Sequence, residues 1–192
     1  MRTIALCCLA LALAAVETGA AAPAFSLPDQ TGATRSLAEA KGSWVVLEWL
    51  NHDCPFVKKH YAGNIQKLQQ DLAAQGVVWW SIISSAPGKQ GHVDAAGAAA
   101  QMTAKQSKAA AVLLDPEGTV GKLYGAKTTP QCVLISPEGV IVYQGALDSV
   151  PSADVADIGT ATNYVAQAFA EASAGKPVSV PESKPYGCSV KY

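Results

Sequence analysis

Residues 47–61 read LEWLNHDCPFVKKHY and are the most informative stretch of the chain. An apolar strand leads into a polar elbow at residues 51–53, and a single cysteine, Cys54, then precedes Pro55. Proline suits the first position of a helix, so the thiol lies at a helix N-terminus, beside unsatisfied N–H groups and the positive end of the macrodipole. That environment favours the thiolate, which is the nucleophilic form of cysteine. The pattern predicts a reactive Cys54 in preference to an inert packed one.

The rest of the chain alternates between strand-like and helix-like patterns. Nearly unbroken apolar runs are typical of strands covered on both sides, and apolar residues at helical spacing predict amphipathic helices. This order predicts an α/β fold, with a central mixed sheet and helices on both faces. Cys54 then lies at the carboxyl edge of the sheet, where open α/β sheets place their sites. The expected strands are residues 44–50, 77–83, 111–114, 131–135 and 140–144. The expected helices are residues 55–74, 95–108 behind an Asp94 cap, 119–124 and 160–174. The chain also contains a short strand and turn over residues 24–32, a helical turn over 36–39 and an irregular tail from about residue 175.

The first residues have the composition of a secretory signal peptide. A basic N-terminus precedes an apolar run over residues 4–16 and small residues over 18–22. The run is too short to span a bilayer, which takes about 20 residues. We therefore expect a signal peptide at residues 1–21, cleaved at one of the alanines that close it, and a single domain at residues 22–192. Export, most simply to a bacterial periplasm, follows from that interpretation.

Charge and hydropathy exclude several classes of partner. The formal net charge is −1, with 14 basic and 15 acidic residues. There is no basic run and no second hydrophobic span, so the sequence gives no electrostatic case for nucleic acid or an anionic membrane surface. We expect no stable membrane insertion.

Three cysteines follow the predicted signal peptide. Cys54 has no partner at C-x-x-C spacing, because that position is Val57. A resolving thiol must therefore come from Cys132, from Cys188 or from another molecule. Cys188 follows a glycine in the tail motif KPYGC, and a tail can reach a distant site, so it is the favoured partner. Cys132 stands in an apolar strand, where a packed small hydrophobe is expected.

Four polar residues near Cys54 each have a chemical and a structural interpretation. Glu48, a carboxylate within an apolar strand, is either a desolvated general acid/base or an edge residue in contact with water. Lys58, one turn after Cys54, either stabilises the thiolate or faces solvent. His52 and His60 are either metal ligands beside the thiolate or packed or solvated side chains. Their spacing matches no metal motif, so no metal site is expected.

Four blocks of sequence carry a resemblance to a known family. They are AFSLPD at residues 24–29, the Cys54 block, YGAKTTP at residues 124–130 and YGCSVKY at residues 186–192. In this order they resemble the thioredoxin superfamily, specifically its redoxin branch (alkyl hydroperoxide reductase and thiol-specific antioxidant proteins) and the peroxiredoxin-like group within it.

The resemblance implies a thioredoxin-like fold with Cys54 at the position of the first active-site cysteine. It also implies a cis Pro130 opposite Cys54, with the backbone of Thr129 free to bind an extended substrate segment. Glu48 stands where thioredoxins carry a buried acid, which supports its acid/base interpretation.

The departures from the family pattern concern the activity. Peroxiredoxins hold peroxide with a threonine three residues before the reactive cysteine and with a downstream arginine. Here the first position is Asn51, and the chain's arginines, Arg2 and Arg35, both lie upstream. The second active-site cysteine of thioredoxins is replaced by Val57.

Together these observations predict an exported thiol–disulfide oxidoreductase in which Cys54 is the nucleophile and Cys188 resolves the intermediate. Its partners would be protein or small-molecule thiols and disulfides together with an unidentified reductant, and no cofactor is expected. Two alternatives stay open. One is a slow thiol peroxidase that forms a sulfenic acid. The other is a module without turnover that binds a protein partner or copper, similar to the Sco-type copper chaperones, although those use two cysteines in one loop.

Overall fold

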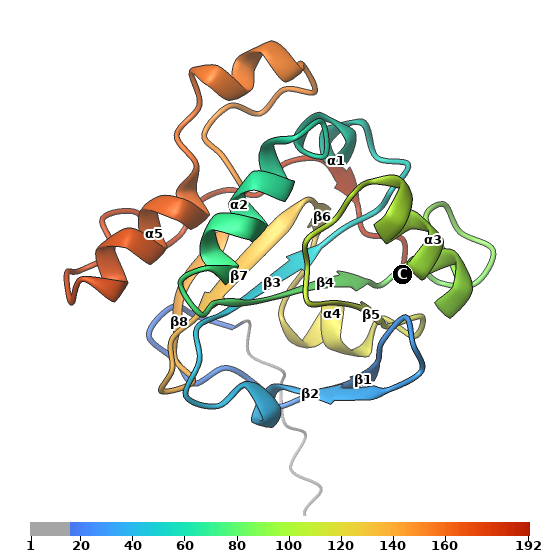
Figure 1. Cartoon of the computed structure of the whole chain (residues 1–192), viewed down its shortest axis with the longest axis horizontal. Coiled ribbons are helices and arrows are strands. Elements are labelled where there is room, and N and C mark those ends of the chain that lie inside the picture. Colours follow the sequence, from blue (N-terminus) through green and yellow to red (C-terminus); the bar gives the residue numbers. More distant parts are fainter. Residues whose placement is uncertain (1–15) are drawn as a thin grey trace, which may run out of the picture.

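The computed structural model describes residues 16–192 (Figure 1). Its helices and strands follow one another in the order β1 (Ser26–Pro28), β2 (Thr34–Ser36), η1 (Leu37–Ala40), β3 (Val45–Trp49), α1 (Pro55–His60), α2 (Asn64–Ala73), β4 (Val78–Ile83), α3 (Ala95–Ala104), β5 (Ala111–Leu114), α4 (Thr119–Leu123), β6 (Thr128–Thr129), β7 (Gln131–Ile135), β8 (Ile141–Gly145), η2 (Val155–Gly159), α5 (Tyr164–Ser173) and β9 (Cys188–Ser189).

Five strands form the central sheet in the order β5-β4-β3-β7-β8. β3 pairs in parallel with β4 and antiparallel with β7, and β8 continues from β7 as an antiparallel hairpin. β3 is therefore the middle strand, and the chain that leaves its end carries Cys54. The expected α/β fold with a central mixed sheet is confirmed.

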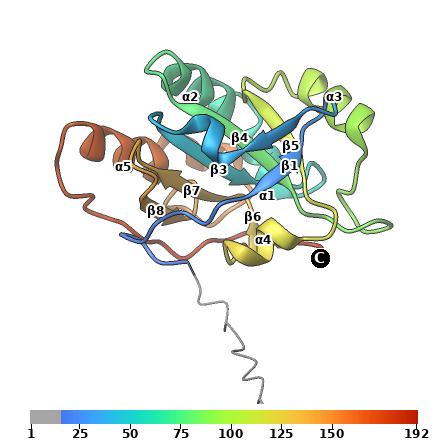
Figure 2. The same cartoon turned by 90° about the horizontal axis from the view of Figure 1, so that it is seen from below.

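The two faces of the sheet are covered differently (Figure 1 and Figure 2). Because successive residues of a strand point to opposite faces, Val46 packs with residues of α1, α2 and α5, whereas Leu47 packs with residues of β1 and α4. Helices thus lie on both faces, and the β1–β2 hairpin completes the second one. Trp79 and Trp80, neighbours in β4, are buried on opposite faces as core residues.

The single helix expected over residues 55–74 is two helices. α1 ends at His60 and α2 begins at Asn64, with Gly63 between them at φ 122°. Residues with a side chain rarely adopt such a backbone conformation, so the glycine permits the break. The break lets α1 lie over the end of the sheet while α2 packs along β4.

The other helix ends are set by caps. Asp94 accepts a hydrogen bond from Gly97 N at 2.8 Å, which confirms the expected cap of α3. α3 ends earlier than expected, before Gln106, which has a left-handed backbone with φ 51°. α5 begins later than expected, because Asn163 is its cap and accepts from Ala166 N at 2.9 Å.

Residues 16–22, which include the end of the predicted signal peptide, lie along the outer side of the β7–β8 hairpin. Gly19 N donates to Ile141 O (2.8 Å), and Ile141 N donates to Ala20 O (3.0 Å). The rest of the predicted signal peptide, residues 1–15, lies outside the described residues. In the described part of the chain, no helix has the length and apolar character needed to cross a membrane.

The tail after α5 is irregular over most of its length, as expected, but it is bound to the domain. β9 pairs antiparallel with β6, and this pairing sets Cys188 opposite Thr129. Beyond β9, Val190 N donates to Lys127 O at 3.0 Å. The hydroxyl of the final residue, Tyr192, is also bonded to the domain. The tail is therefore held on the C-terminal side of Cys188.

Candidate active site

Cys54 is the N-cap of α1 and follows a loop whose shape is fixed by Asn51. The Asn51 side chain accepts a hydrogen bond from Asp53 N (2.9 Å) and donates one to Gln90 O (3.2 Å). Cys54 N donates to Asn51 O (3.0 Å), and Pro55 takes the first helical position, as expected. The turn thus places the thiol at the carboxyl end of the middle strand.

The Cys54 side chain is completely buried and has several hydrogen-bonding neighbours. Its thiol donates to Thr129 O at 3.1 Å. Burial acts to raise the pKa of the Cys54 thiol, but hydrogen bonds from the Cys188 side chain and from the backbones of Val57 and Cys188 outweigh burial, so the pKa is lowered. A lowered pKa increases the thiolate fraction, which is what a nucleophilic cysteine requires.

Cys188 is the second thiol of the site and lies against Cys54. Gly187 lets the tail approach this closely: its φ is 133°, and a Cβ there would lie 2.0 Å from Thr129 O. Burial raises the pKa of the Cys188 thiol to about 11, and the hydrogen bond and charge of Cys54 contribute to the rise. The two sulfurs therefore differ in the direction of their pKa shifts.

The peptide bond between Thr129 and Pro130 is cis, as the resemblance implies. The expectation that the Thr129 backbone is free is wrong in this arrangement. Its carbonyl accepts the hydrogen bond from Cys54, and its strand is paired with the tail at Cys188. An extended substrate segment must displace β9 before it can pair with this edge.

Glu48 lies in the middle strand and is completely buried, so the edge interpretation is wrong. Its Oε2 accepts hydrogen bonds from Tyr61 (3.1 Å), Trp79 (2.9 Å) and Ser81 (2.8 Å). Burial raises the pKa of the carboxyl, although the three hydrogen bonds act to lower it. The carboxyl has the environment of a proton carrier, but none of these hydrogen bonds comes from Cys54.

Three other residues singled out from the sequence are not hydrogen-bonded to Cys54. Cys132 is buried in β7 opposite Glu48, and burial raises the pKa of its thiol well above the ordinary value, so it is a packed core residue. Lys58 is exposed. His52 is buried, and burial lowers its pKa to about 4. Among residues 16–192, no group of three or more His, Cys, Asp and Glu side chains is placed to hold a metal ion.

A buried charged cluster beside the site was missed from the sequence. Lys59 Nζ lies 3.1 Å from Asp148 Oδ2, and both side chains are almost completely buried. Tyr186, two residues before Cys188, donates its hydroxyl hydrogen bond to Asp148 Oδ1. His60 Nε2 lies 3.3 Å from the same hydroxyl, and burial lowers the pKa of His60 to about 4. The available signal was the position of Lys59 and His60 one turn after an apolar helix residue, which sets them on the packed side of α1.

The groups that would activate peroxide are not assembled around Cys54. Arg35, the arginine within the described chain, lies in β2 and pairs with Asp29 at 2.9 Å. Asn51, at the position where peroxiredoxins carry threonine, uses its side chain to shape the loop. Neither side chain is therefore available to a peroxide at the sulfur.

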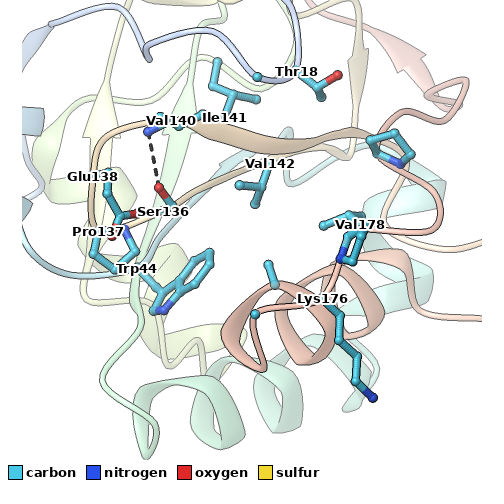
Figure 3. A pocket seen from close by; sticks show the side chains of 15 residues that line it. Thr18, Trp44, Ser136, Pro137, Glu138, Val140, Ile141, Val142, Lys176 and Val178 are labelled. Atoms are coloured by element: carbon cyan, nitrogen blue, oxygen red, sulfur yellow. Dashed lines mark hydrogen bonds between the residues drawn. The ribbon is translucent and has the colours of Figure 1, made fainter.

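A cavity of about 650 Å³ lies at the other end of the sheet. Figure 3 shows Trp44, Val142 and Val178 around it, together with Lys176 at its rim. Trp44 precedes β3 whereas Cys54 follows it, so this cavity is separate from the thiol site.

A buried strand-to-helix cysteine beside a cis proline, on a five-stranded mixed sheet, defines a thioredoxin-like thiol redox protein. The sequence profile of the AhpC/TSA family matches residues 18–144, and the chain belongs to this family. The resemblance to the redoxin branch is thereby confirmed. A comparison with functionally curated proteins gave no match.

Solved structures agree with this assignment. A hypothetical protein from Sinorhizobium meliloti 1021 is 26% identical, with 93% of this chain and 96% of that chain covered and a TM-score of 0.76. A putative thiol:disulfide interchange protein DsbE from Chlorobium tepidum is 26% identical, covering 68% and 85% of the two chains, with a TM-score of 0.53. A putative thioredoxin from Neisseria meningitidis, 22% identical over 80% and 92% of the two chains, has a TM-score of 0.57 and shares the fold.

Proposed function

We propose that this protein is an exported thiol–disulfide oxidoreductase in which Cys54 attacks and Cys188 resolves. The observation that carries the proposal is the position of Cys188: β9 sets it opposite Thr129, whose carbonyl accepts the hydrogen bond from Cys54. The opposite pKa shifts of the two thiols agree with this arrangement. Membership of a thiol-dependent family and the similarity to an interchange protein support the same reaction class. Export rests on the composition of the first residues, and the periplasm is the compartment proposed.

The first chemical step is attack by the Cys54 thiolate on one sulfur of a substrate disulfide. A bond forms between Cys54 and that sulfur, the substrate S–S bond breaks, and the second substrate sulfur leaves as a thiolate. Cys54 is the group that attacks first because its pKa is lowered, whereas Cys188 is still protonated. The product is a mixed disulfide.

The second step uses a change in the pKa of Cys188. Once Cys54 is part of the mixed disulfide, its negative charge no longer raises the pKa of Cys188, so the second thiol ionises more readily. The Cys188 thiolate then attacks the Cys54 sulfur, and the remaining substrate sulfur leaves. The substrate disulfide becomes two thiols, and a Cys54–Cys188 disulfide is formed. An external dithiol returns the enzyme to the reduced form, and the same steps in reverse oxidise a dithiol.

The roles proposed for Glu48, Thr129 and Pro130 follow from this scheme. Glu48 lies on the same face of the sheet as Cys54, so its carboxyl is proposed to exchange protons with the site. Thr129 and Pro130 are proposed to contact the substrate once the tail has moved.

The test uses the reduction of a peptide disulfide by wild type and three variants. Cys54→Ser should abolish exchange. Cys188→Ser should accumulate the mixed disulfide, visible as an added mass on the intact protein. Cys132→Ser is the matched control and should leave exchange unchanged. Full activity in Cys54→Ser would refute the proposal.

A second candidate function is slow peroxide reduction, favoured by membership of the AhpC/TSA family. Because neither Asn51 nor Arg35 is available to the peroxide, we propose a rate close to that of an ordinary thiolate. Peroxide consumption followed by stopped flow measures this rate. A value several orders of magnitude higher would make peroxide the primary substrate.

A further inference from the structure

The tail is held on the N-terminal side of Cys188 by the buried charged cluster. Lys59 Nζ contacts Asp148 Oδ2 at 3.1 Å and Val150 O at 3.0 Å. Tyr186 joins the cluster through its hydroxyl, which donates to Asp148 Oδ1 and lies 3.5 Å from Lys59 Nζ. The cluster therefore connects the active-site helix to the tail.

The cluster is costly to form unless the tail is docked. Lys59 and Asp148 have exposed side-chain fractions of 0% and 3%, and buried charges destabilise a fold unless hydrogen bonds satisfy them. Tyr186 supplies one of the hydrogen bonds to the carboxylate. If the tail moves away, Asp148 loses that donor and Lys59 loses the adjacent hydroxyl. The contact of Tyr186 with the Lys59–Asp148 pair thus favours the docked position of the tail.

The ring of Tyr186 adds an apolar contact to the same element. Its centroid lies 5.7 Å from that of Phe56, in an edge-to-face arrangement, and Phe56 lies two residues after Cys54. Both ends of the Tyr186 side chain therefore contact α1 or the ion pair behind it.

The short connection makes this contact a constraint on Cys188. Tyr186 and Cys188 are separated by one residue, and extended chain spans at most about 3.6 Å per residue. On the other side, Val190 N donates to Lys127 O at 3.0 Å. The Cys188 thiol is consequently fixed from both directions.

We propose that Tyr186 is a positioning residue for the resolving thiol. With Lys59 and Asp148 it forms a latch that holds Cys188 against Cys54, so that the effective concentration of Cys188 at Cys54 is high. This inference rests on the proposed function, in which these two thiols form the redox pair. A released latch frees the edge of Thr129 and exposes Cys54.

The experiment compares Tyr186→Phe with Tyr124→Phe. Tyr186→Phe keeps the ring on Phe56 and removes the hydroxyl from Asp148. Tyr124→Phe is the matched control, because it removes a tyrosine hydroxyl whose hydrogen bond, at 2.6 Å, goes to Pro23 O and not to a residue of the tail.

Two readouts are needed. The first is the equilibrium in a glutathione redox buffer, where the Cys54 and Cys188 thiols give up two electrons and two protons to form a disulfide while oxidised glutathione becomes two reduced molecules. Intact mass gives the fractions of reduced and disulfide protein, and these fractions give the effective concentration of Cys188 at Cys54. We expect this effective concentration to fall about tenfold in Tyr186→Phe and to be unchanged in Tyr124→Phe.

The second readout is the rate at which iodoacetamide alkylates Cys54 in the fully reduced proteins. Because Cys54 is 0% exposed with the tail docked, we expect Tyr186→Phe to react about tenfold faster, and Tyr124→Phe to react at the wild-type rate. A general loss of stability would accelerate alkylation in both variants, and urea unfolding of each identifies that case.

The outcomes separate the latch from the redox pair. If wild type forms no Cys54–Cys188 disulfide in any glutathione buffer, the proposed function fails, and the alkylation rates still decide whether the latch exists. If the disulfide forms but Tyr186→Phe matches Tyr124→Phe in both readouts, the latch is overturned while the proposed function stands.

Discussion

The Cys188 side chain stabilises the Cys54 thiolate, and its removal should weaken the acidity of Cys54. Among the groups that lower the pKa of Cys54, the Cys188 side chain contributes most, ahead of the Val57 and Cys188 backbones. Cys188→Ala deletes that donor and leaves the backbone contributions in place. The pKa of Cys54 should therefore rise in this variant.

The size of the effect follows from the number and kind of hydrogen bonds. A hydrogen bond to a charged group contributes about 1.5 kcal/mol, and about 1.4 kcal/mol corresponds to a tenfold change in an equilibrium constant. Loss of one such bond should lower the acid dissociation constant of Cys54 about tenfold. Cys188→Ser retains a hydroxyl donor at the same position, so its effect should be clearly smaller.

The assay is the ultraviolet absorbance of the thiolate as a function of pH. Spectra of Cys54→Ser supply the contribution of the remaining thiols, including Cys132, whose pKa burial raises. The reasoning is refuted if Cys188→Ala titrates at the same pH as wild type, or at a lower one. An equal rise in Cys188→Ala and Cys188→Ser would show that the serine hydroxyl does not replace the thiol as a hydrogen-bond donor to Cys54.

Three further predictions concern stability and access to the site. Burial lowers the pKa of His52 from 6.5 to about 4, so the unfolded chain binds more protons between these pH values and stability should fall as the pH is lowered from about 6.5 to about 4. By linkage, the loss in the free energy of unfolding that comes from His52 is about 3 kcal/mol at pH 4. His52→Gln should abolish this loss when urea unfolding at the two pH values is compared. Gly187→Ala places a Cβ 2.0 Å from Thr129 O and should cost the docked tail about 2 kcal/mol, seen as faster alkylation of Cys54; an unchanged rate would show that the backbone adapts. Lys59→Met leaves Asp148 buried without its partner and should lower the free energy of unfolding in urea by about 3 kcal/mol. The double variant Lys59→Met/Asp148→Asn should lose less stability than the sum of the losses in the two single variants. Additive losses would contradict the buried pair.

The sheet and the position of Cys54 were predictable because they depend on local patterns. Nearly unbroken apolar runs predict buried strands, and Pro55 after Cys54 predicts a helix start. The expected strand over residues 111–114 coincides with β5. The end of α1 was missed because a single glycine, Gly63, decides it through its backbone conformation, which apolar spacing does not report.

The contacts of the tail were not predictable in the same way. Cys188 was favoured as the partner of Cys54 on reach alone, whereas its placement depends on pairing between β6 and β9, which are far apart in sequence. The Lys59–Asp148 pair joins residues still farther apart in the sequence. In addition, hydropathy assigns both residues to the surface. Burial of such residues follows from their mutual neutralisation, which only the folded arrangement supplies.

The absence of a C-x-x-C motif explains why the buried charged cluster is needed to position the second thiol. When both thiols lie on one helix, the helix itself keeps them together. Here Val57 occupies that second position, and the second thiol is on a tail whose freedom must be removed by other contacts. The tail is fixed by Tyr186 before Cys188 and by Val190 after it. In the proposed mechanism Cys188 resolves the mixed disulfide and can move away together with the tail. The contacts that position Cys188 would then also determine when Cys54 and the edge of Thr129 become accessible to a substrate.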